Sequence, residues 1–218
     1  MFKNLARNAF VWTFVGLLPQ FSDVGNGGNF GLAIGGEFNE TLSIGDSGPS
    51  LDTLVTLDGI LFDSKSYQDA QVIVLAFTCV TCPYALDYES RLVAFANDCK
   101  KDKKSVAILA VDSNDIPGDS LESMKTRYAE KKYPFEFLKD SGQVVATKFG
   151  ASKTPEFFVL NRDRKVVYMG AFDDNTDANK VTKYYVLDAV EAVLAGGKIE
   201  HQETAAVGCR IRAKRERR

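Results

Sequence analysis

The sequence predicts an α/β domain that begins at about residue 41. Short and almost uninterrupted apolar runs are typical of strands that are covered on both faces, and between them apolar residues recur at helical spacing. Segments of these two kinds alternate along the chain, as they do in α/β domains. The length of 218 residues allows one such domain with a segment left over at each end.

The first half of this domain should contain three strands and one long helix. The strands are predicted at residues 53–57, 71–77 and 106–111, and the second and third are the most apolar. A helix should run from about residue 80 to 100, because Pro83 fits a first helical turn, where the missing N–H costs little. Cys99 continues the apolar stripe of this helix and is expected to be a small buried core residue.

The second half should contain three further helices and a hairpin. Helices are predicted at 120–131, where Ser120 can cap the first turn, at 142–149 and at 177–195. Gly150 and Gly196 follow the last two and can end them. Residues 155–160 and 165–169 are apolar and flank a polar stretch, so we expect a β-hairpin there.

Cys79 and Cys82 form a C-x-x-C pair between the central apolar run and the long helix. A cysteine at a helix N-terminus meets unpaired backbone N–H groups and the positive end of the helix dipole, which favour a thiolate. We therefore predict Cys79 as a nucleophile and Cys82, one turn later, as the cysteine that resolves a mixed disulfide.

The other interpretation of a C-x-x-C pair is half of a zinc site. The remaining cysteines, Cys99 and Cys209, are isolated, and His201 is the only histidine of the chain. Neither a metal nor an organic cofactor is therefore expected.

Residues 1–40 combine an apolar N-terminal segment with a linker rich in Gly, Asn and Asp. Lys3 and Arg7 precede the apolar run 9–18, which has the charge and length of a signal peptide and is too short for a transmembrane span. Two interpretations stay open: the protein is periplasmic or secreted if residues 1–27 are a signal peptide, and cytoplasmic if they form an ordinary apolar helix.

Residues 201–218 form a basic C-terminal tail, because residues 210–218 hold six Lys and Arg residues against one Glu. We expect a solvated, mobile segment. The formal net charge of −2 gives no reason to expect a nucleic-acid partner.

Residues 43–49 read S-I-G-D-S-G-P, residues 57–59 read L-D-G, and residues 77–84 read F-T-C-V-T-C-P-Y. The first two resemble the "G-D-x-A-P … D-G" opening of the alkyl hydroperoxide reductase/thiol-specific antioxidant (AhpC/TSA) branch of thioredoxin-like proteins, the redoxins. The third resembles the "F-T-C-x-x-C-P-Y" motif of a bacterial redoxin-domain group. Residues 111–115, 153–156 and 207–209 resemble further motifs of that group.

The resemblance implies a thioredoxin-like fold at residues 41–200, with a central mixed sheet flanked by helices and extra N-terminal strands. It also implies a cis-proline loop at Thr154-Pro155 that faces the cysteines and, with Thr78, binds an extended substrate. The implied partners are a protein dithiol or disulfide substrate and a separate electron donor or acceptor.

Three functions remain to be weighed. The leading hypothesis is a thiol–disulfide oxidoreductase that uses Cys79 and Cys82. The alternative is a peroxiredoxin-like peroxidase that uses Cys82, although Leu75 then stands where that family has its proline and Cys79 where it has its threonine. The third is a redox-inactive interaction module, which would leave both cysteines inert to alkylation.

Cys209 follows Gly208 just beyond the last predicted helix. It is either a bystander or an auxiliary redox cysteine, because a mobile tail can carry a thiol across the surface at high effective concentration. We predict that Cys209 accepts the disulfide from Cys79.

Overall fold

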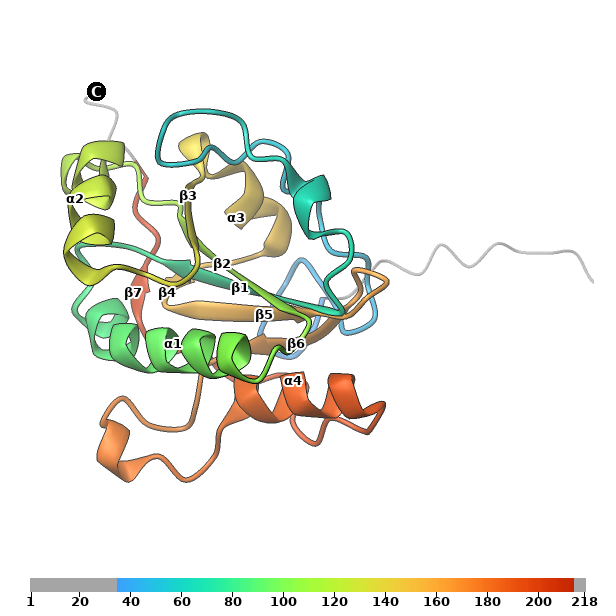
Figure 1. Ribbon diagram of the computed structural model, residues 1–218. Coiled ribbons are helices and arrows are strands. Elements are labelled where there is room, and N and C mark those ends of the chain that lie inside the picture. Colours follow the sequence, from blue (N-terminus) through green and yellow to red (C-terminus); the bar gives the residue numbers. More distant parts are fainter. Residues whose placement is uncertain (1–34, 214–218) are drawn as a thin grey trace, which may run out of the picture. The chain divides into compact units, whose positions relative to one another are not determined.

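A mixed five-stranded sheet forms the centre of the structure, a computed structural model that describes residues 35–213 (Figure 1). Its strands lie in the order β3-β2-β1-β5-β6. β1 (Val72–Thr78), β2 (Val106–Asp112) and β3 (Glu136–Lys139) run parallel, whereas β5 (Glu156–Leu160) and β6 (Val166–Gly170) form an antiparallel hairpin beside β1. The predicted mixed sheet flanked by helices is confirmed.

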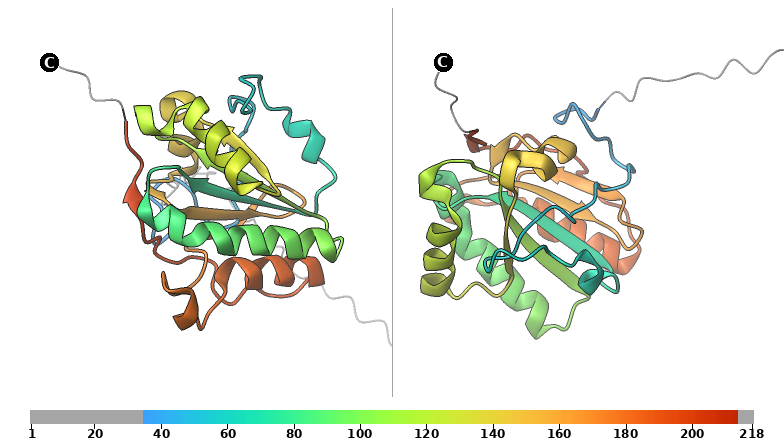
Figure 2. Two further views of the ribbon diagram at one scale, coloured as in Figure 1. Left: turned by 60° about the vertical axis from the view of Figure 1, so that its left-hand side comes forward. Right: turned by 90° about the horizontal axis from the view of Figure 1, so that it is seen from above.

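Alternate side chains of the central strand enter two separate cores, because successive residues of a strand point to opposite faces. Val74 faces the core beneath α1 (Pro83–Lys101) and α4 (Tyr185–Ala195), which lie side by side on one face of the sheet (Figures 1 and 2). Leu75 faces the opposite core, which α3 (Val144–Phe149) and residues 42–62 cover. Both faces of β1 are therefore buried from solvent, as its apolar sequence predicts.

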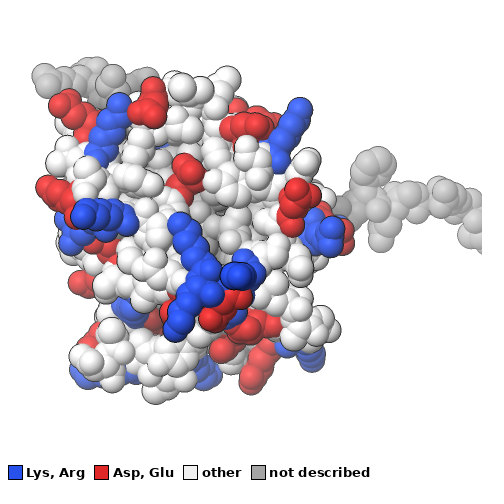
Figure 3. Space-filling model, viewed as in Figure 1, with Lys and Arg blue, Asp and Glu red and all other residues white. Residues whose placement is uncertain are grey.

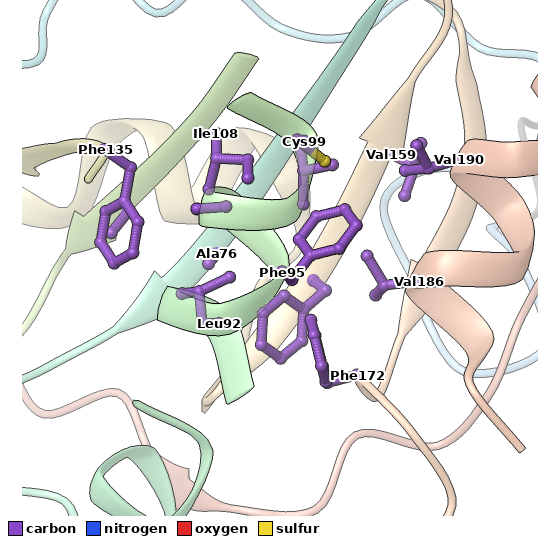
Figure 4. Close-up of a cluster of buried hydrophobic side chains, with 14 of the residues drawn as sticks. Ala76, Leu92, Phe95, Cys99, Ile108, Phe135, Val159, Phe172, Val186 and Val190 are labelled. Atoms are coloured by element: carbon purple, nitrogen blue, oxygen red, sulfur yellow. The ribbon is translucent and has the colours of Figure 1, made fainter. Parts of the chain in front are cut away.

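Cys99 lies in the first of these cores. Figure 4 shows it on α1, among Phe95, Val159 and Val190. Burial raises the pKa of the Cys99 thiol to about 11, so it stays protonated at neutral pH. The expectation of a buried core cysteine is confirmed.

Most predicted elements are present with shifted ends. α1 begins at Pro83 because Cys82 is its N-cap and has an extended backbone. α2 (Leu121–Lys131) is capped as expected, since the Ser120 hydroxyl accepts a hydrogen bond from Ser123 N at 3.2 Å. Gly150 and Gly196 end α3 and α4 in the left-handed conformation that glycine adopts easily.

The predicted start of the last helix at Asp177 is wrong by eight residues. The Asp177 carboxylate accepts a hydrogen bond from Asn179 N and starts a separate 3-10 turn, Ala178–Lys180. Val181 then has an extended backbone, and α4 begins at Tyr185. A local side-chain hydrogen bond has replaced the first two helical turns.

The predicted strand at 53–57 is also wrong. Only Val55 pairs there, in isolated bridges to Leu61 and Lys139. Gly59, with φ of 78°, turns the chain back on itself, and Thr56 N donates to Ile60 O. The turn leaves too few extended residues for a regular strand.

Two short strands were not predicted. β4 (Lys153–Thr154) and β7 (Cys209–Arg210) form a small antiparallel sheet, in which Thr154 is paired with Cys209. β7 runs alongside the domain near the start of α1 (Figure 2). The expectation of a mobile, solvated segment around Cys209 is therefore corrected, because residues 209–212 are hydrogen-bonded to the domain.

Within residues 35–213, no helix has the length and apolar character that crossing a membrane requires. The apolar run 9–18, the proposed signal peptide and residues 214–218 of the basic tail lie outside the described residues.

Candidate active site

Cys79 and Cys82 lie where β1 ends and α1 begins, opposite the loop that contains Pro155. The Thr154–Pro155 peptide bond is cis, as the resemblance implied. The Cys82 thiol donates to the Thr154 carbonyl at 3.1 Å, and the Cys79 thiol donates to the Thr154 hydroxyl at 3.6 Å. The structure thus brings together the two cysteines and the loop that the sequence analysis singled out.

The two thiols differ in their access to solvent. Cys82 is 0% exposed, and Cys79 is 4% exposed. Both pack against Ala85 in the first turn of α1, and Cys209 contacts the same cluster. An external molecule would therefore meet Cys79 before Cys82.

A hydrogen bond between the two thiols couples their ionisation. It lowers the pKa of Cys82 to about 4, with further help from Cys209, Thr154 and the Ala85 N–H, and burial opposes this shift. The same hydrogen bond raises the pKa of Cys79, and burial and the carboxylates of Asp119 and Asp112 add to the rise. The pair therefore loses its first proton far below the ordinary range of a thiol and keeps its second to high pH.

Asp119 holds the two residues between the cysteines. One carboxylate oxygen accepts from Val80 N and Thr81 N, both at 2.9 Å, and the other accepts from the Thr81 hydroxyl at 2.8 Å. Asn114 Nδ2 donates to that second oxygen at 2.8 Å. Because Asp119 is fully buried, these contacts fix the backbone of the C-x-x-C turn.

A second buried carboxylate, Asp112, lies at the end of β2, directly beside Thr78 of β1. Burial raises the pKa of Asp112 to about 7, and Lys139, whose Nζ lies 3.3 Å from Oδ1, opposes this rise. Lys139 Nζ also donates to the carbonyls of Asn114 and Asp119. Lys139 thereby links the Asp112 carboxylate to the backbone of the loop after β2.

Asp119, Asn114 and Lys139 are parts of the site that were not predicted, although residues 111–115 carry one of the resembled motifs. A usable signal was present: polar residues directly follow the apolar strand β2, and the carboxyl ends of β1 and β2 meet at one edge of the sheet. This signal indicates Asn114 but not Asp119 or Lys139, which lie further along the chain.

Arg212 connects the C-terminal segment to the same network. Its backbone N–H donates to Asn114 Oδ1 at 2.7 Å, and its carbonyl accepts from Asp115 N at 2.8 Å. Its guanidinium donates to the Thr81 hydroxyl at 2.5 Å. The segment predicted as a free tail therefore contacts the turn between the cysteines.

A narrow apolar pocket opens beside Cys79. Thr78 and Pro155, predicted to bind substrate, line it together with Cys79 and the aromatic residues Tyr88, Tyr133 and Phe157. Thr154 is fully buried, and its strand β4 is paired with β7. An extended substrate that bound at this loop would therefore lie next to β7.

Residues 35–213 contain no cluster of three or more His, Cys, Asp or Glu side chains suited to hold a metal ion. On the face seen in Figure 3, acidic and basic side chains are interspersed and form no single basic patch.

The chain is similar to known proteins over most of its length. The family model described as Redoxin matches residues 43–186. Among solved structures, a hypothetical protein from Sinorhizobium meliloti is 30% identical, with a TM-score of 0.72, over 79% of this chain and 96% of its own. An uncharacterized conserved protein from Geobacillus kaustophilus is 31% identical, also with a TM-score of 0.72, over 80% of this chain and 94% of its own.

A more distant structure shares the fold alone: a peroxidoxin from Mycobacterium tuberculosis is 17% identical, with a TM-score of 0.54, over 70% of this chain and 96% of its own. No curated protein matches the chain.

Proposed function

The chain belongs to the Redoxin family, and from this premise we propose that it is a thiol–disulfide oxidoreductase that works through Cys79 and Cys82. The family and the thioredoxin-like fold support thiol-based redox chemistry. The choice of disulfide exchange rests on one observation: two thiols lie in one cluster at the start of a helix, both hydrogen-bonded to Thr154, and Cys79 is the more exposed of the two.

The first step is attack on a substrate disulfide. The pair holds one negative charge at neutral pH, and transfer of the remaining proton from Cys79 to Cys82 places the thiolate on the accessible sulfur. The Cys79 thiolate attacks one substrate sulfur, the substrate S–S bond breaks, and the released thiolate takes up a proton from solvent. A mixed disulfide between Cys79 and the substrate results.

The second step frees the substrate. Cys82 loses its proton and attacks the Cys79 sulfur, which forms the Cys79–Cys82 disulfide and expels the second substrate thiolate. That thiolate takes up the proton that Cys82 lost. The substrate has then gained two electrons and the protein has lost two. A separate dithiol donor returns the protein to its reduced state.

Trapping distinguishes the roles of the two cysteines. The Cys82→Ser variant should accumulate a mixed disulfide at Cys79 with disulfide-linked insulin or with oxidised glutathione, because nothing resolves it. The Cys79→Ser variant should trap little, and Cys99→Ser, which removes a buried thiol of the same helix, should behave as the unmodified protein. Mass spectrometry of non-reduced peptides reads out each adduct.

Peroxidase chemistry at Cys82 is the second candidate, and the lowered pKa of Cys82 favours it. Its complete burial opposes it, because a peroxide has no direct access to the sulfur. Better trapping by Cys79→Ser than by Cys82→Ser, together with rapid formation of a sulfenic acid on Cys82 by hydrogen peroxide, would favour the peroxidase.

A further inference from the structure

Three cysteines gather at this site. Cys79 and Cys82 belong to one buried cluster, Cys209 packs against that cluster, and the pKa of Cys82 responds to hydrogen bonds from both other thiols. Cys209 comes from β7, more than a hundred residues along the chain. A disulfide on Cys82 therefore has two intramolecular partners within reach.

The position of Cys209 is set by the surrounding backbone. Cys209 is paired with Thr154, whose carbonyl also accepts the Cys82 thiol, so one residue places both sulfurs. Gly208 permits this close pairing, because a Cβ atom there would lie 2.2 Å from the Thr154 carbonyl oxygen. Ile211 N donates to Ser152 O at 2.9 Å and extends the β4–β7 pairing by one residue.

We propose that Cys209 attacks Cys82 of the oxidised pair and moves the disulfide from Cys79–Cys82 to Cys82–Cys209. The proposal rests on the proposed function, since disulfide exchange with a substrate supplies the Cys79–Cys82 bond. In this step the Cys209 thiolate forms a bond to the Cys82 sulfur, the Cys79–Cys82 bond breaks, and the Cys79 thiolate takes the proton that Cys209 lost. No electrons enter or leave the protein.

The redox state of Cys82 controls when Cys209 can attack. With the pair reduced, the hydrogen bond to Cys82 is the main cause that raises the pKa of Cys209 to about 11, and Cys209 stays a protonated thiol. In the Cys79–Cys82 disulfide, Cys82 carries no charge, so it no longer stabilises the protonated form of Cys209. The charge of Arg212, which lowers the pKa of Cys209, still acts. Oxidation of the pair thus makes Cys209 a better nucleophile.

We call this transfer of the disulfide from Cys79–Cys82 to Cys82–Cys209 the relay. It separates the site that reacts with substrate from the site that reacts with the electron donor. Cys79 becomes a free thiol again at the apolar pocket where substrate is expected, while the disulfide is held between Cys82 and Cys209. Of these two, Cys82 is fully buried and Cys209 is partly exposed. A dithiol donor would then attack Cys209 from the side of β7, and it would not compete with substrate at Cys79.

The Cys79→Ser variant tests whether the second disulfide forms. After oxidation with diamide, non-reducing peptide mapping should find Cys82 linked to Cys209. The linkage should persist in Cys79→Ser/Cys99→Ser, the matched control, and should be lost in Cys79→Ser/Cys209→Ser. A Cys79→Ser protein in which Cys209 remains fully alkylatable after oxidation contradicts the relay.

Partly oxidised protein with all four cysteines tests whether the disulfide moves. Rapid acid quenching and alkylation should show two populations, one linked Cys79–Cys82 and one linked Cys82–Cys209 with Cys79 alkylated. A single Cys79–Cys82 population contradicts the relay and leaves the proposed function intact. The converse result, a Cys82–Cys209 bond in a protein that fails to reduce insulin disulfides, supports the relay chemistry and removes the proposed function.

Discussion

The pKa of the Cys82 thiol is determined more by its hydrogen-bonding neighbours than by its burial. It is completely buried, and burial alone would raise the pKa of a thiol. Hydrogen bonds from Cys79, Cys209, Thr154 and the Ala85 N–H outweigh that effect and lower its pKa to about 4. Cys99, equally buried on the same helix but among apolar side chains, shows the opposite shift.

We predict that Cys82→Ala raises the pKa of the thiolate at this site. The thiol whose pKa is about 4 is then absent; Cys79 loses the hydrogen bond that contributes most to its raised pKa, but burial and the carboxylates of Asp119 and Asp112 still raise that pKa above the ordinary range of a thiol. Since each unit of pKa changes the thiolate fraction about tenfold, alkylation of Cys79 by iodoacetamide at pH 6 should slow by about tenfold or more. The pH dependence of the alkylation rate measures the shift.

Cys99→Ala is the matched control for this experiment. It removes a thiol from the same helix without touching the pair, so the pH profile of Cys79 should not move. An unchanged profile in Cys82→Ala would mean that the two thiols are not coupled.

At the scale of elements, the start of α1 depends on a carboxylate from another part of the chain. The Cys82 side chain makes no capping hydrogen bond to the helix. The amides of the two preceding residues, Val80 and Thr81, donate instead to Asp119, which lies just before α2. The site is therefore built where the loop after β2 crosses the end of β1. Its backbone geometry depends on both segments.

We predict that Asp119→Ala lowers the free energy of unfolding by about 2 to 4 kcal/mol, since it leaves several buried donors without an acceptor. Urea denaturation followed by circular dichroism measures the change. The Asp115→Ala variant removes a neighbouring carboxylate that is exposed, and it should change stability by less than about 0.5 kcal/mol. Equal effects of the two substitutions would show that Asp119 does not hold the turn.

At the scale of the whole molecule, segments from both ends of the described chain are hydrogen-bonded to the central domain. Near the start, Asn39 Nδ2 donates to Phe149 O at 2.8 Å, and Asn39 Oδ1 accepts from Thr41 N and Leu42 N. Near the end, Thr204 bonds to Tyr168 and Ala171 of the β6 region. The buried side chain of Asn39 thus links the segment around residues 39–42 to α3.

We predict that Asn39→Ala destabilises the protein by about 2 kcal/mol or more, because two amides and one carbonyl lose their partners in a buried position. Thermal unfolding should show a lowered midpoint. Asn179→Ala, an exposed asparagine, is the control and should have little effect. If the midpoint did not change in Asn39→Ala, the N-terminal segment would not contribute to the stability of the core.

Sequence patterns predicted the elements whose signal is local. β1, β2 and the β5–β6 hairpin lie within a residue or two of the expected ranges, because a buried strand needs a continuous apolar run. The strand at 53–57 and the first turns of the last helix failed because Gly59 and Asp177 make alternative local hydrogen bonds. β7 could not be predicted, since it has two residues and exists only through its pairing with β4.

The sequence by itself determined the fold class, the C-x-x-C pair at the head of a helix and the loop at Thr154 and Pro155, because each depends on residues adjacent in the chain. Only the tertiary structure decided which groups surround the sulfurs. Asp119, Lys139 and Arg212 reach the site from segments tens of residues apart, where the carboxyl ends of β1 and β2 meet. Cys209 joins Cys82 through a strand pairing that no local pattern encodes. The ionisation of a thiol depends on charges and donors a few ångströms away, and that proximity is created by folding.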